Sequence, residues 1–384
     1  MWRQASLFEK APAIKIAPEL KERLNLLAQE SRFDLAGSCA KDPFGRGRRR
    51  GPLGRWLYPV VLPNGRRMTL FRTLLSNKCF SDCAYCPLRA DNDPLRLSLS
   101  PEEIAKAFMA LWQKRIVHGL FLSSGVFAAP DTVMEHLIQV ARILREKEGF
   151  QGYIHLKVIP GASEAAIAEA AKFANALSVN LEAPSARYLS SLSRRKDFAK
   201  VFENLKKISL IRERRGFSFS QTTQFVVGAA GEKDADIIFQ TAFLYERLKL
   251  NRVYFSAYQP GLGRKDVPGE ALAYKSNFLL REHRLYQVDF MLRKYGFKAE
   301  EIPLKNGFLS LEKDPKEAWA AENQAFFPVN VNRASYWKLL RVPGIGPTIA
   351  KRIVAARKHA RLRDIEPFFP NKKLFAKAKR YVCY

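Results

Sequence analysis

NKCFSDCAYCPLR, residues 77–89, contains three of the chain's cysteines within eight positions. Its cysteines Cys79, Cys83 and Cys86 follow the spacing C-x3-C-x2-C, and no fourth cysteine lies nearby. A closed electron-transfer cluster and a structural zinc site both take four protein ligands. Three thiolates on one short loop can ligate three corners of a cubane and leave one iron open to another molecule. The spacing therefore predicts a [4Fe–4S] cluster with one vacant coordination position.

The alternative is a zinc site that Cys39 or a distant histidine would complete. No histidine precedes His118, so a local zinc knuckle cannot form and His118 would have to come from another strand. The chain has 5 cysteines in 384 residues, too few for a disulfide scaffold. In a cytosolic chain, a close group of three cysteines favours a metal site.

On both sides of this loop, short apolar runs alternate with segments of helical period. One such segment, residues 100–115, has Ser100 as N-cap and Glu103 at the capping-box position. Strands joined by helical crossovers indicate a parallel sheet, and six of them suggest a partial (β/α)6 TIM-like barrel. In that α/β fold, reactive groups lie on loops after the carboxyl ends of strands, where the cysteine loop falls. The six runs are residues 68–75, 119–124, 153–159, 176–182, 218–228 and 251–258.

A three-cysteine loop of this spacing, between a first strand and a helix, resembles that of the radical S-adenosylmethionine (SAM) superfamily. Tyr85, just before the last cysteine, fits the same pattern, and the resemblance covers roughly residues 66–260. It implies that the open iron chelates the amino and carboxylate groups of SAM. An electron from the reduced cluster then breaks the C5′–S bond, and the 5′-deoxyadenosyl radical removes a hydrogen atom from the substrate. An electron donor such as flavodoxin or ferredoxin is implied as well.

The resemblance also implies where SAM is held. The family's Gly-Gly-Glu-type turn falls here on Ser123, Ser124 and Gly125, which lack the acid, so that backbone carbonyls would have to replace it. Polar residues on the fourth and fifth strands are expected at the same mouth, and Tyr85 is expected to pack on the cluster and the adenine edge. The strand residues are Asn180, Glu182, Gln221, Thr223 and Gln224. For each, the alternative is an ordinary polar or packing role.

Two cysteines remain outside the loop. Cys39 is a candidate thiol hydrogen donor to a substrate radical, with a small buried hydrophobic residue as the alternative. Cys383, next to the last residue, is unassigned.

Charge points to a polyanionic partner. The chain carries 65 Lys and Arg against 37 Asp and Glu, a net +28. Basic residues that neutralise phosphates release counterions, which favours nucleic acid over the alternatives of a merely soluble basic surface or anionic lipid. A loop at residues 42–55 either clamps a phosphate backbone or is a solvated basic loop. Its arginines are Arg46, Arg48, Arg49, Arg50 and Arg55.

Near the other end, residues 329–358 place a tight Pro-Gly-Ile-Gly-Pro turn between two helical patterns. The turn leaves the N–H groups of a helix N-terminus free beside glycines, which suits a phosphate. The motif closely resembles the helix-hairpin-helix module, which binds the DNA backbone, although structural and protein-binding hairpins exist. Residues 326–384 carry 14 Lys and Arg against 2 acids. The candidate DNA-binding residues are Gly344, Ile345, Gly346, Thr348, Lys351 and Arg352.

These features predict four regions. They are an N-terminal helical and Arg-rich extension (1–66), a radical SAM core (67–300), a linker (301–325) and a small all-α helix-hairpin-helix domain (326–384). The combination resembles radical SAM proteins described as DNA modification or repair proteins, which are thought to work beside a uracil-DNA-glycosylase-like partner. We therefore expect an enzyme that modifies or repairs nucleic acid, DNA in the first place.

Two alternatives stay open. One is a cluster-bearing DNA-binding or redox-sensing protein without turnover. The other is an RNA-modifying radical SAM enzyme, which is disfavoured because methylthiotransferases of that kind carry extra cysteines for a second cluster. No apolar run approaches the ~18 residues of a membrane span, and the first residues lack a signal peptide's apolar centre. We expect a cytoplasmic protein.

Overall fold

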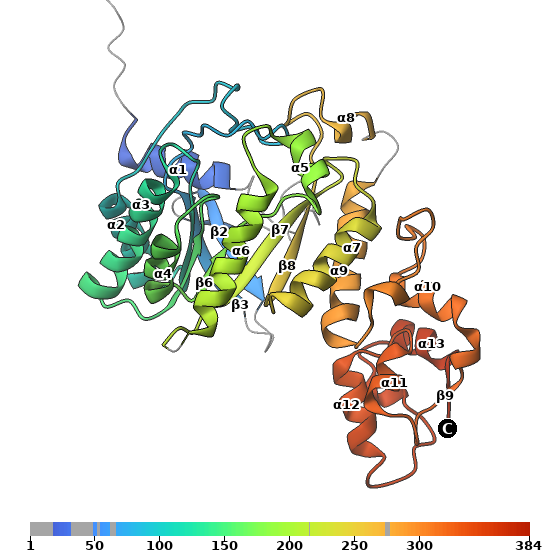
Figure 1. The fold of residues 1–384 in the computed structure, drawn as a ribbon. Coiled ribbons are helices and arrows are strands. Elements are labelled where there is room, and N and C mark those ends of the chain that lie inside the picture. Colours follow the sequence, from blue (N-terminus) through green and yellow to red (C-terminus); the bar gives the residue numbers. More distant parts are fainter. Residues whose placement is uncertain (1–17, 32–48, 52–53, 62–66, 215, 273–276) are drawn as a thin grey trace, which may run out of the picture.

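The structure is a computed structural model that describes residues 18–31, 49–51, 54–61, 67–214, 216–272 and 277–384. Figure 1 shows a curved sheet with helices along its outer side and a small domain at the C-terminal end. Cys39, Arg46 and Arg48 lie outside the described residues. Arg49, Arg50 and Arg55 are described by their backbone alone.

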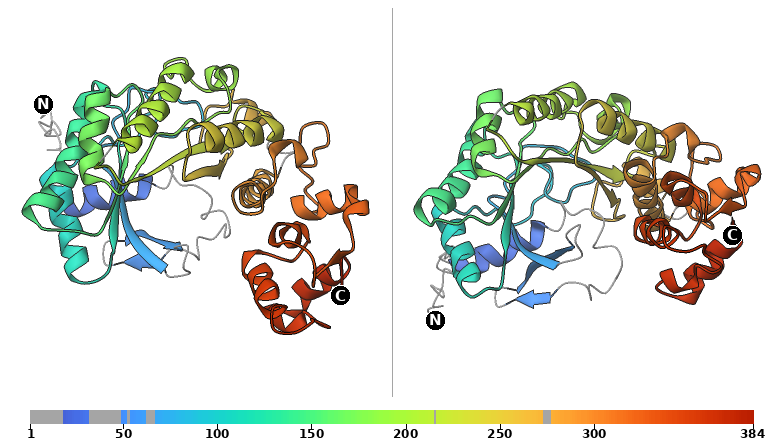
Figure 2. Two further views of the ribbon diagram at one scale, coloured as in Figure 1. Left: turned by 60° about the horizontal axis from the view of Figure 1, so that its bottom comes forward. Right: turned by 90° about the horizontal axis from the view of Figure 1, so that it is seen from below.

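All six predicted strands form, and they run parallel in chain order. The curled half-barrel that they build (Figure 2) confirms the predicted partial TIM-like barrel. The fourth strand is shorter than predicted, because its regular pairing ends at Ser178, and Glu182, which has a φ of +67°, forms an isolated bridge with Phe225 of β7. The strands are β3 (Arg67–Leu74), β4 (Gly119–Ser123), β5 (Tyr153–Lys157), β6 (Ala176–Ser178), β7 (Ser220–Val227) and β8 (Arg252–Ala257).

The N-terminal extension adds a β-hairpin that the sequence analysis missed. β1 (Arg49–Gly51) pairs antiparallel with β2 (Gly54–Val61), and β2 pairs antiparallel with β3. The sequence analysis interpreted residues 42–55 as a loop because they are rich in arginine, glycine and proline, but β1 and the start of β2 lie within them. The predicted N-terminal helix is confirmed as α1 (Leu20–Glu30), whose Leu27 is buried in the main core.

Alternation along the strands gives the sheet two different faces. The apolar side chains of Leu120, Leu122, Ile154 and Leu156 are fully buried in the core with the helices. Side chains of the opposite parity, such as Arg72, Phe121 and His155, lie on the face turned away from those helices. The helices are α2 (Pro101–Gln113), α3 (Pro130–Arg142) with the π-helical turn η2 (Ile143–Lys147), α4 (Glu164–Phe173), α5 (Ala186–Leu192), α6 (Phe198–Glu213), α7 (Asp234–Arg247), α8 (Pro268–Leu272) and α9 (Phe278–Lys294).

Local capping explains where α2 begins. The Ser100 side chain accepts a hydrogen bond from the Glu103 N–H at 3.2 Å, and the Glu103 carboxylate accepts one from the Ser100 N–H at 2.9 Å. This confirms the predicted capping box.

The C-terminal domain has its own hydrophobic core, which includes Leu339, Val342, Ile345 and Ile353. One correction concerns its class: the domain is not purely helical, because β9 and β10 form a short parallel pair. Cys383 lies in β10, and its carbonyl accepts a hydrogen bond from the Val331 N–H at 2.9 Å. The elements are β9 (Val329–Asn330), α11 (Tyr336–Arg341), α12 (Pro347–Ala356), η5 (Glu366–Phe368), α13 (Lys372–Lys379) and β10 (Val382–Cys383).

The expected linker is packed rather than open. It contains η3 (Ala299–Glu301), α10 (Pro315–Glu322) and η4 (Gln324–Phe326). Trp319 on α10 is 5% exposed, and its ring meets Phe297 at 5.2 Å and Phe326 at 5.3 Å between centroids. The Arg341 guanidinium from α11 lies 5.0 Å from the Trp319 ring centroid. Trp319 therefore joins the barrel to the C-terminal domain.

Within the described part of the chain, no helix is long and apolar enough to cross a membrane.

We predict that Trp319→Ala lowers the free energy of unfolding by about 3–5 kcal/mol, because it leaves a cavity in this joint. The matched control is Trp337→Ala on α11, whose side chain is 57% exposed and whose loss should change stability much less. Chemical denaturation of both variants measures the difference. Equal effects would contradict the role given to Trp319.

Candidate functional site

The cysteine loop lies at the carboxyl end of β3, where loops that follow other strands hold it. The Phe80 N–H donates to the Val126 carbonyl at 2.7 Å, after β4. The Ala84 N–H donates to the Leu192 carbonyl at 2.7 Å, at the end of α5, and the Ala84 carbonyl accepts from the Arg264 N–H at 2.7 Å, after β8. The parallel sheet brings these segments together because all its strands end at the same edge.

Gly125 lets the turn after β4 approach this loop. A Cβ atom at Gly125 would lie 2.2 Å from the Lys78 carbonyl oxygen and 3.2 Å from the Cys79 Cβ. Its N–H also donates to the Ser76 carbonyl at 2.7 Å. The predicted turn of Ser123, Ser124 and Gly125 therefore lies directly beside the cysteines, and only glycine fits at its last position.

Asp82, inside the cysteine loop, fixes the loop to the segment after α5. Its carboxylate accepts hydrogen bonds from the Ser193 hydroxyl, the Arg194 N–H at 3.0 Å and the Arg195 N–H at 3.3 Å. Burial alone would raise the pKa of Asp82, but these hydrogen bonds lower it below its ordinary value. Sequence reasoning did not identify this anchor, since a lone acid between cysteines has no distinctive pattern.

A buried ion pair stands next to the cysteines. The Lys196 ammonium lies 3.0 Å from a Glu182 carboxylate oxygen and 3.3 Å from the Tyr85 hydroxyl. The side chains of Lys196 and Glu182 are only 13% and 7% exposed. The structure thus brings together two predicted site residues, Tyr85 and Glu182. Lys196 was missed, although the basic run at 194–196 after a short helix is a visible signal.

Electrostatics link this pair to the thiols. Burial raises the pKa of Cys83 and Cys86 above the ordinary thiol value, and the Lys196 charge opposes that rise. Burial alone would lower the pKa of Lys196, but the charges of Cys83 and Glu182 raise it, so its ammonium form is favoured. A cation is thus held beside sulfurs that must be thiolates to bind metal.

The donor set fits an iron–sulfur cluster. Cys79, Cys83 and Cys86 are free thiols on one loop and are close enough to influence one another's pKa. Soft thiolates are the ligands that such clusters take. Within the described ranges, no three His, Cys, Asp or Glu side chains gather tightly enough to hold a single metal ion. A cubane attaches each cysteine to a different iron, so its sulfurs need not converge on one point.

His118 lies too far from the cysteines to complete a zinc site. His118 precedes β4, and its N–H donates to the Thr69 carbonyl at 2.7 Å near the amino end of the sheet. The five residues of β4 separate it from the mouth by about 16 Å at ~3.3 Å per residue. The other suggested ligand, Cys39, lies outside the described residues.

Of the polar strand residues, Asn180 follows the end of β6. Its side-chain oxygen accepts a hydrogen bond from the Lys157 ammonium on β5. Asn180 stands two residues before Glu182, in the segment that leaves β6 for the mouth.

Gln221 and Thr223 are not brought to the mouth, so that prediction is wrong. The Gln221 amide accepts from the Ser209 hydroxyl at 2.8 Å and donates to the Leu205 carbonyl at 2.7 Å, both on α6. The Thr223 hydroxyl bonds the backbone beyond β6. Alternation places both residues on the helix side of β7, whereas Gln224 has the opposite parity. Sequence alone did not show which parity faces inward.

The face of the sheet turned away from the helices is cationic and aromatic. Arg72 lies 4.1 Å from the Phe121 ring centroid, and the Phe121 and His155 rings are 4.5 Å apart. Farther along, Arg252 lies 5.1 Å from the Tyr254 ring centroid. A surface of this kind suits a ligand that has both negative charge and a flat ring.

The C-terminal turn has the shape predicted from its glycines. Gly344 has a φ of +85°, and a Cβ there would lie 2.7 Å from the Leu374 carbonyl oxygen. Ile345 is fully buried, its N–H donates to the Val342 carbonyl, and its own carbonyl accepts from the Lys316 ammonium at 2.6 Å. Ile345 was expected to contact DNA, but these contacts occupy its polar groups, so it shapes the turn instead.

Most of the other candidate DNA-binding residues lie at the N-terminal end of α12. Gly346 is its N-cap, no side chain caps the helix, and its first backbone bond joins the Ala350 N–H to the Gly346 carbonyl. The amides of the first turn therefore lack intrahelical partners. Thr348, Lys351 and Arg352 are exposed beside them.

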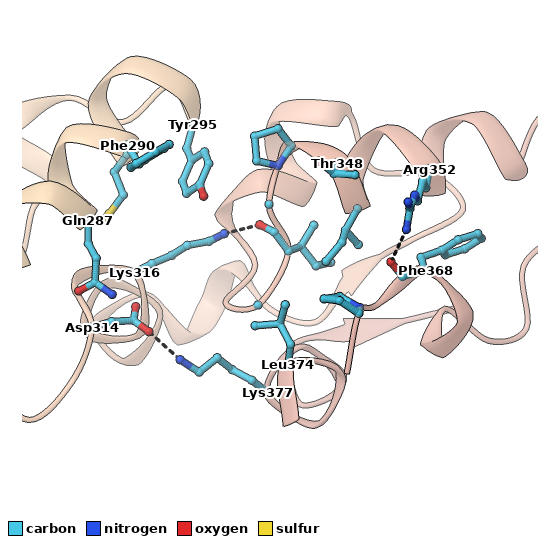
Figure 3. Close-up of a pocket in the computed structure, with 17 residues that line it drawn as sticks. Gln287, Phe290, Tyr295, Asp314, Lys316, Thr348, Arg352, Phe368, Leu374 and Lys377 are labelled. Atoms are coloured by element: carbon cyan, nitrogen blue, oxygen red, sulfur yellow. Dashed lines mark hydrogen bonds and ion pairs between the residues drawn. The ribbon is translucent and has the colours of Figure 1, made fainter. Parts of the chain in front are cut away.

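The same end of α12 lines a cavity of about 580 Å³. Figure 3 shows Phe290 of α9 and Tyr295, which follows that helix, on one side of it and the hairpin on the other. Lys316 crosses the space between them to reach the hairpin. The hairpin is thus tied to α10 by this hydrogen bond.

Comparisons with known proteins agree with this architecture. Residues 73–238 match the radical SAM superfamily, and residues 324–378 match the helix-hairpin-helix motif. A search of curated proteins finds no match.

Three similar solved structures are enzymes. Methylornithine synthase is 15% identical over 72% of this chain and 69% of its own, with a TM-score of 0.47. The FeFe-hydrogenase maturase from Carboxydothermus hydrogenoformans is 15% identical over 95% and 82%, with a TM-score of 0.44. A radical SAM methyltransferase from Sphaerobacter thermophilus is 17% identical over 53% and 66%, with a TM-score of 0.37.

The barrel of this chain is therefore a radical SAM domain, followed by a helix-hairpin-helix motif. Radical SAM proteins use a [4Fe–4S] cluster and SAM, which are the cofactors predicted from the cysteine loop.

We predict that Gly125→Ala lowers the iron and sulfide content of anaerobically reconstituted protein. The new methyl group would displace the Lys78 carbonyl, and overpacking of this kind costs about 1–3 kcal/mol. The control is Ser124→Ala, which leaves the backbone approach unchanged. Normal cluster content in Gly125→Ala would show that the close approach does not matter.

Lys316 predicts a pH dependence of stability. Burial lowers the pKa of its ammonium to about 7. Above this value the folded chain has lost a proton that the unfolded chain keeps until the ordinary lysine range, ~10.4. The free energy of unfolding should therefore rise between about pH 7 and pH 10. Lys316→Met should abolish the rise. Urea denaturation at several pH values measures the free energy of unfolding of both proteins, and the same increase with pH in the variant as in the wild type would contradict the prediction.

Proposed function

We propose that this protein is a radical SAM enzyme that modifies or repairs nucleic acid, DNA in the first place. The observation that carries the proposal is the packing of two parts. A barrel with a three-cysteine loop is joined through Trp319 to a helix-hairpin-helix domain of net charge +12, from 14 basic and 2 acidic residues at 326–384.

In this proposal, Cys79, Cys83 and Cys86 hold the cluster. When bound, the cluster supplies the electron that cleaves SAM and so generates the 5′-deoxyadenosyl radical. Lys196 and Glu182 stay paired beside it and fix the Tyr85 hydroxyl.

SAM binding is assigned to the polar groups nearest the cysteines. The backbone of the turn Ser123 to Gly125 replaces the acidic turn of the superfamily, because Gly125 brings it against the Lys78 carbonyl. Asn180 and Glu182 provide the side chains from beyond β6. Gln221 and Thr223 take no part, since they face α6 and the backbone.

The hairpin supplies the nucleic acid contact. Amide N–H groups at the start of α12 donate hydrogen bonds to a phosphate, and Thr348, Lys351 and Arg352 add further donors beside them. A base stacked in a duplex cannot reach the barrel mouth, so the substrate is single-stranded or the base is flipped, which takes a few kcal/mol. Arg72 and Phe121, on the inner face of the sheet, offer charge and a ring surface to such a nucleotide.

The uracil-DNA-glycosylase-like partner implied by the resemblance stays a prediction, as does Cys39 as a hydrogen donor. The two alternatives, a sensor without turnover and an RNA-modifying enzyme, are separated by the experiment that follows.

Two measurements test the proposal. Anaerobic protein with dithionite and SAM should form 5′-deoxyadenosine. If none forms under any condition, the sensor without turnover is favoured.

The affinity for duplex DNA should fall steeply with salt, and Lys351→Glu/Arg352→Glu should weaken it and reduce the slope of log affinity against log salt by about 2. The matched charge control is Lys106→Glu/Lys114→Glu, on α2 and at its C-cap. Tighter binding of RNA than of DNA would favour the RNA enzyme.

A further inference from the structure

The outer side of the cysteine loop exposes a large apolar residue. Phe80, which directly follows Cys79, is 60% exposed. Its backbone is nevertheless fixed, because its N–H bonds the Val126 carbonyl and its carbonyl accepts from the Arg195 guanidinium. The ring therefore stands on a rigid base and faces solvent next to a cluster ligand.

Three cationic residues belong to the segments beside Phe80, since Lys78 stands two residues before it and the guanidinium of Arg195, which follows Arg194, bonds its carbonyl. Lys78, Arg194 and Arg195 are all exposed, and we call these three residues with Phe80 the Phe80 surface. The one acid within this part of the loop, Asp82, is taken up by the segment after α5. The donors to Asp82 are a hydroxyl and two backbone N–H groups, so its carboxylate keeps its charge, and the three cations with this one acid leave a net charge of +2 on the segments around the ring.

The segment around residues 89–91 borders the Phe80 surface on the side of Ser81. The Ser81 carbonyl accepts from the Ala90 N–H at 2.8 Å, which brings the following segment alongside. There Asp91 pairs with Arg89 at 3.0 Å. The Phe80 surface is thus a small, basic, aromatic patch rather than one end of a long groove.

We propose that the Phe80 surface docks a small acidic one-electron carrier protein, which reduces the cluster held by the same loop. The inference rests on the proposed function, because only a redox centre on this loop needs such a partner. In each encounter the carrier loses one electron and the centre gains one; no atom moves between them. Phe80 directly follows the cluster ligand Cys79, and consecutive Cα atoms are ~3.8 Å apart. A carrier docked on Phe80 would therefore lie beside the redox centre, which favours this kind of partner.

The size and charge of the patch suit a transient redox encounter. Complexes of this kind bury less than ~1,200 Å² and depend on complementary charge for fast association. One aromatic anchor inside a charged rim is the usual distribution of binding energy in an interface. A nucleic acid track would need a longer row of cations, such as the 6–10 phosphate contacts typical of tight DNA binding.

The binding experiment uses the reconstituted holoenzyme and an acidic flavodoxin as the probe. Phe80→Ala and Lys78→Glu/Arg194→Glu should each raise the dissociation constant about tenfold or more, and added salt should weaken wild-type binding. Matched controls are Phe239→Ala on α7, where the ring is 46% exposed, and Lys106→Glu on α2, and both should bind flavodoxin as the wild type does. Unchanged binding in the Phe80 and Lys78/Arg194 variants would overturn the proposal. So would a loss of duplex DNA affinity with flavodoxin affinity intact, because the surface would then belong to nucleic acid.

A second measurement separates this proposal from the proposed function. With dithionite as reductant, both variants should form 5′-deoxyadenosine at the wild-type rate, because a small reductant needs no docking. With photoreduced flavodoxin, their rate should fall in line with the loss of affinity. If the wild type forms none with dithionite, the proposed function fails while the binding data still test the surface. Equal losses with both reductants would mean that the substitutions damage the site itself and would overturn the docking role.

Discussion

The architecture depends on how firmly one short loop is held at the carboxyl edge of the sheet. Backbone hydrogen bonds to the Val126 and Leu192 carbonyls and from the Arg264 N–H fix Phe80 and Ala84, and Asp82 accepts three more from the segment after α5. These anchors come from the segments that follow β4, β6 and β8, so several parts of the half-barrel set the loop's shape. Three thiols on a loop free to move would collapse or oxidise, whereas these are kept at fixed places.

The same constraint explains the buried Lys196–Glu182 pair. A buried ion pair contributes little net stability, and its isolated partners are costly, so its presence near the thiols points to a role in the site. The pair holds a positive charge next to Cys83 and orients Tyr85. It also requires Glu182 to leave the strand with a positive φ, which is an unusual conformation for a residue with a side chain.

The C-terminal domain extends this design outward. Trp319, Lys316 and Arg341 tie it to the barrel through aromatic, carbonyl and cation–π contacts. A nucleic acid bound at the start of α12 would therefore be held at a fixed position relative to the barrel. Because the hairpin tip also faces α9 across a cavity, its glycines serve the joint as well as the proposed phosphate site.

Much of this could be predicted from the sequence because it rests on local patterns. The spacing of Cys79, Cys83 and Cys86 needs only a few consecutive residues, and the six strands follow from apolar runs between amphipathic helices. The Gly344 turn and the Ser100 cap are local in the same sense, and the structure confirms both.

What the sequence could not determine depends on contacts between distant segments. Which residues of β7 face the inside of the barrel depends on which side of the strand α6 covers. Because α6 covers the side of Gln221 and Thr223, these two residues do not belong to the site. Lys196 reaches Tyr85 from 111 residues away only because parallel strands end at one edge. Short-range sequence patterns carry backbone preference and periodicity, whereas side-chain partners across crossovers arise only when the sheet closes.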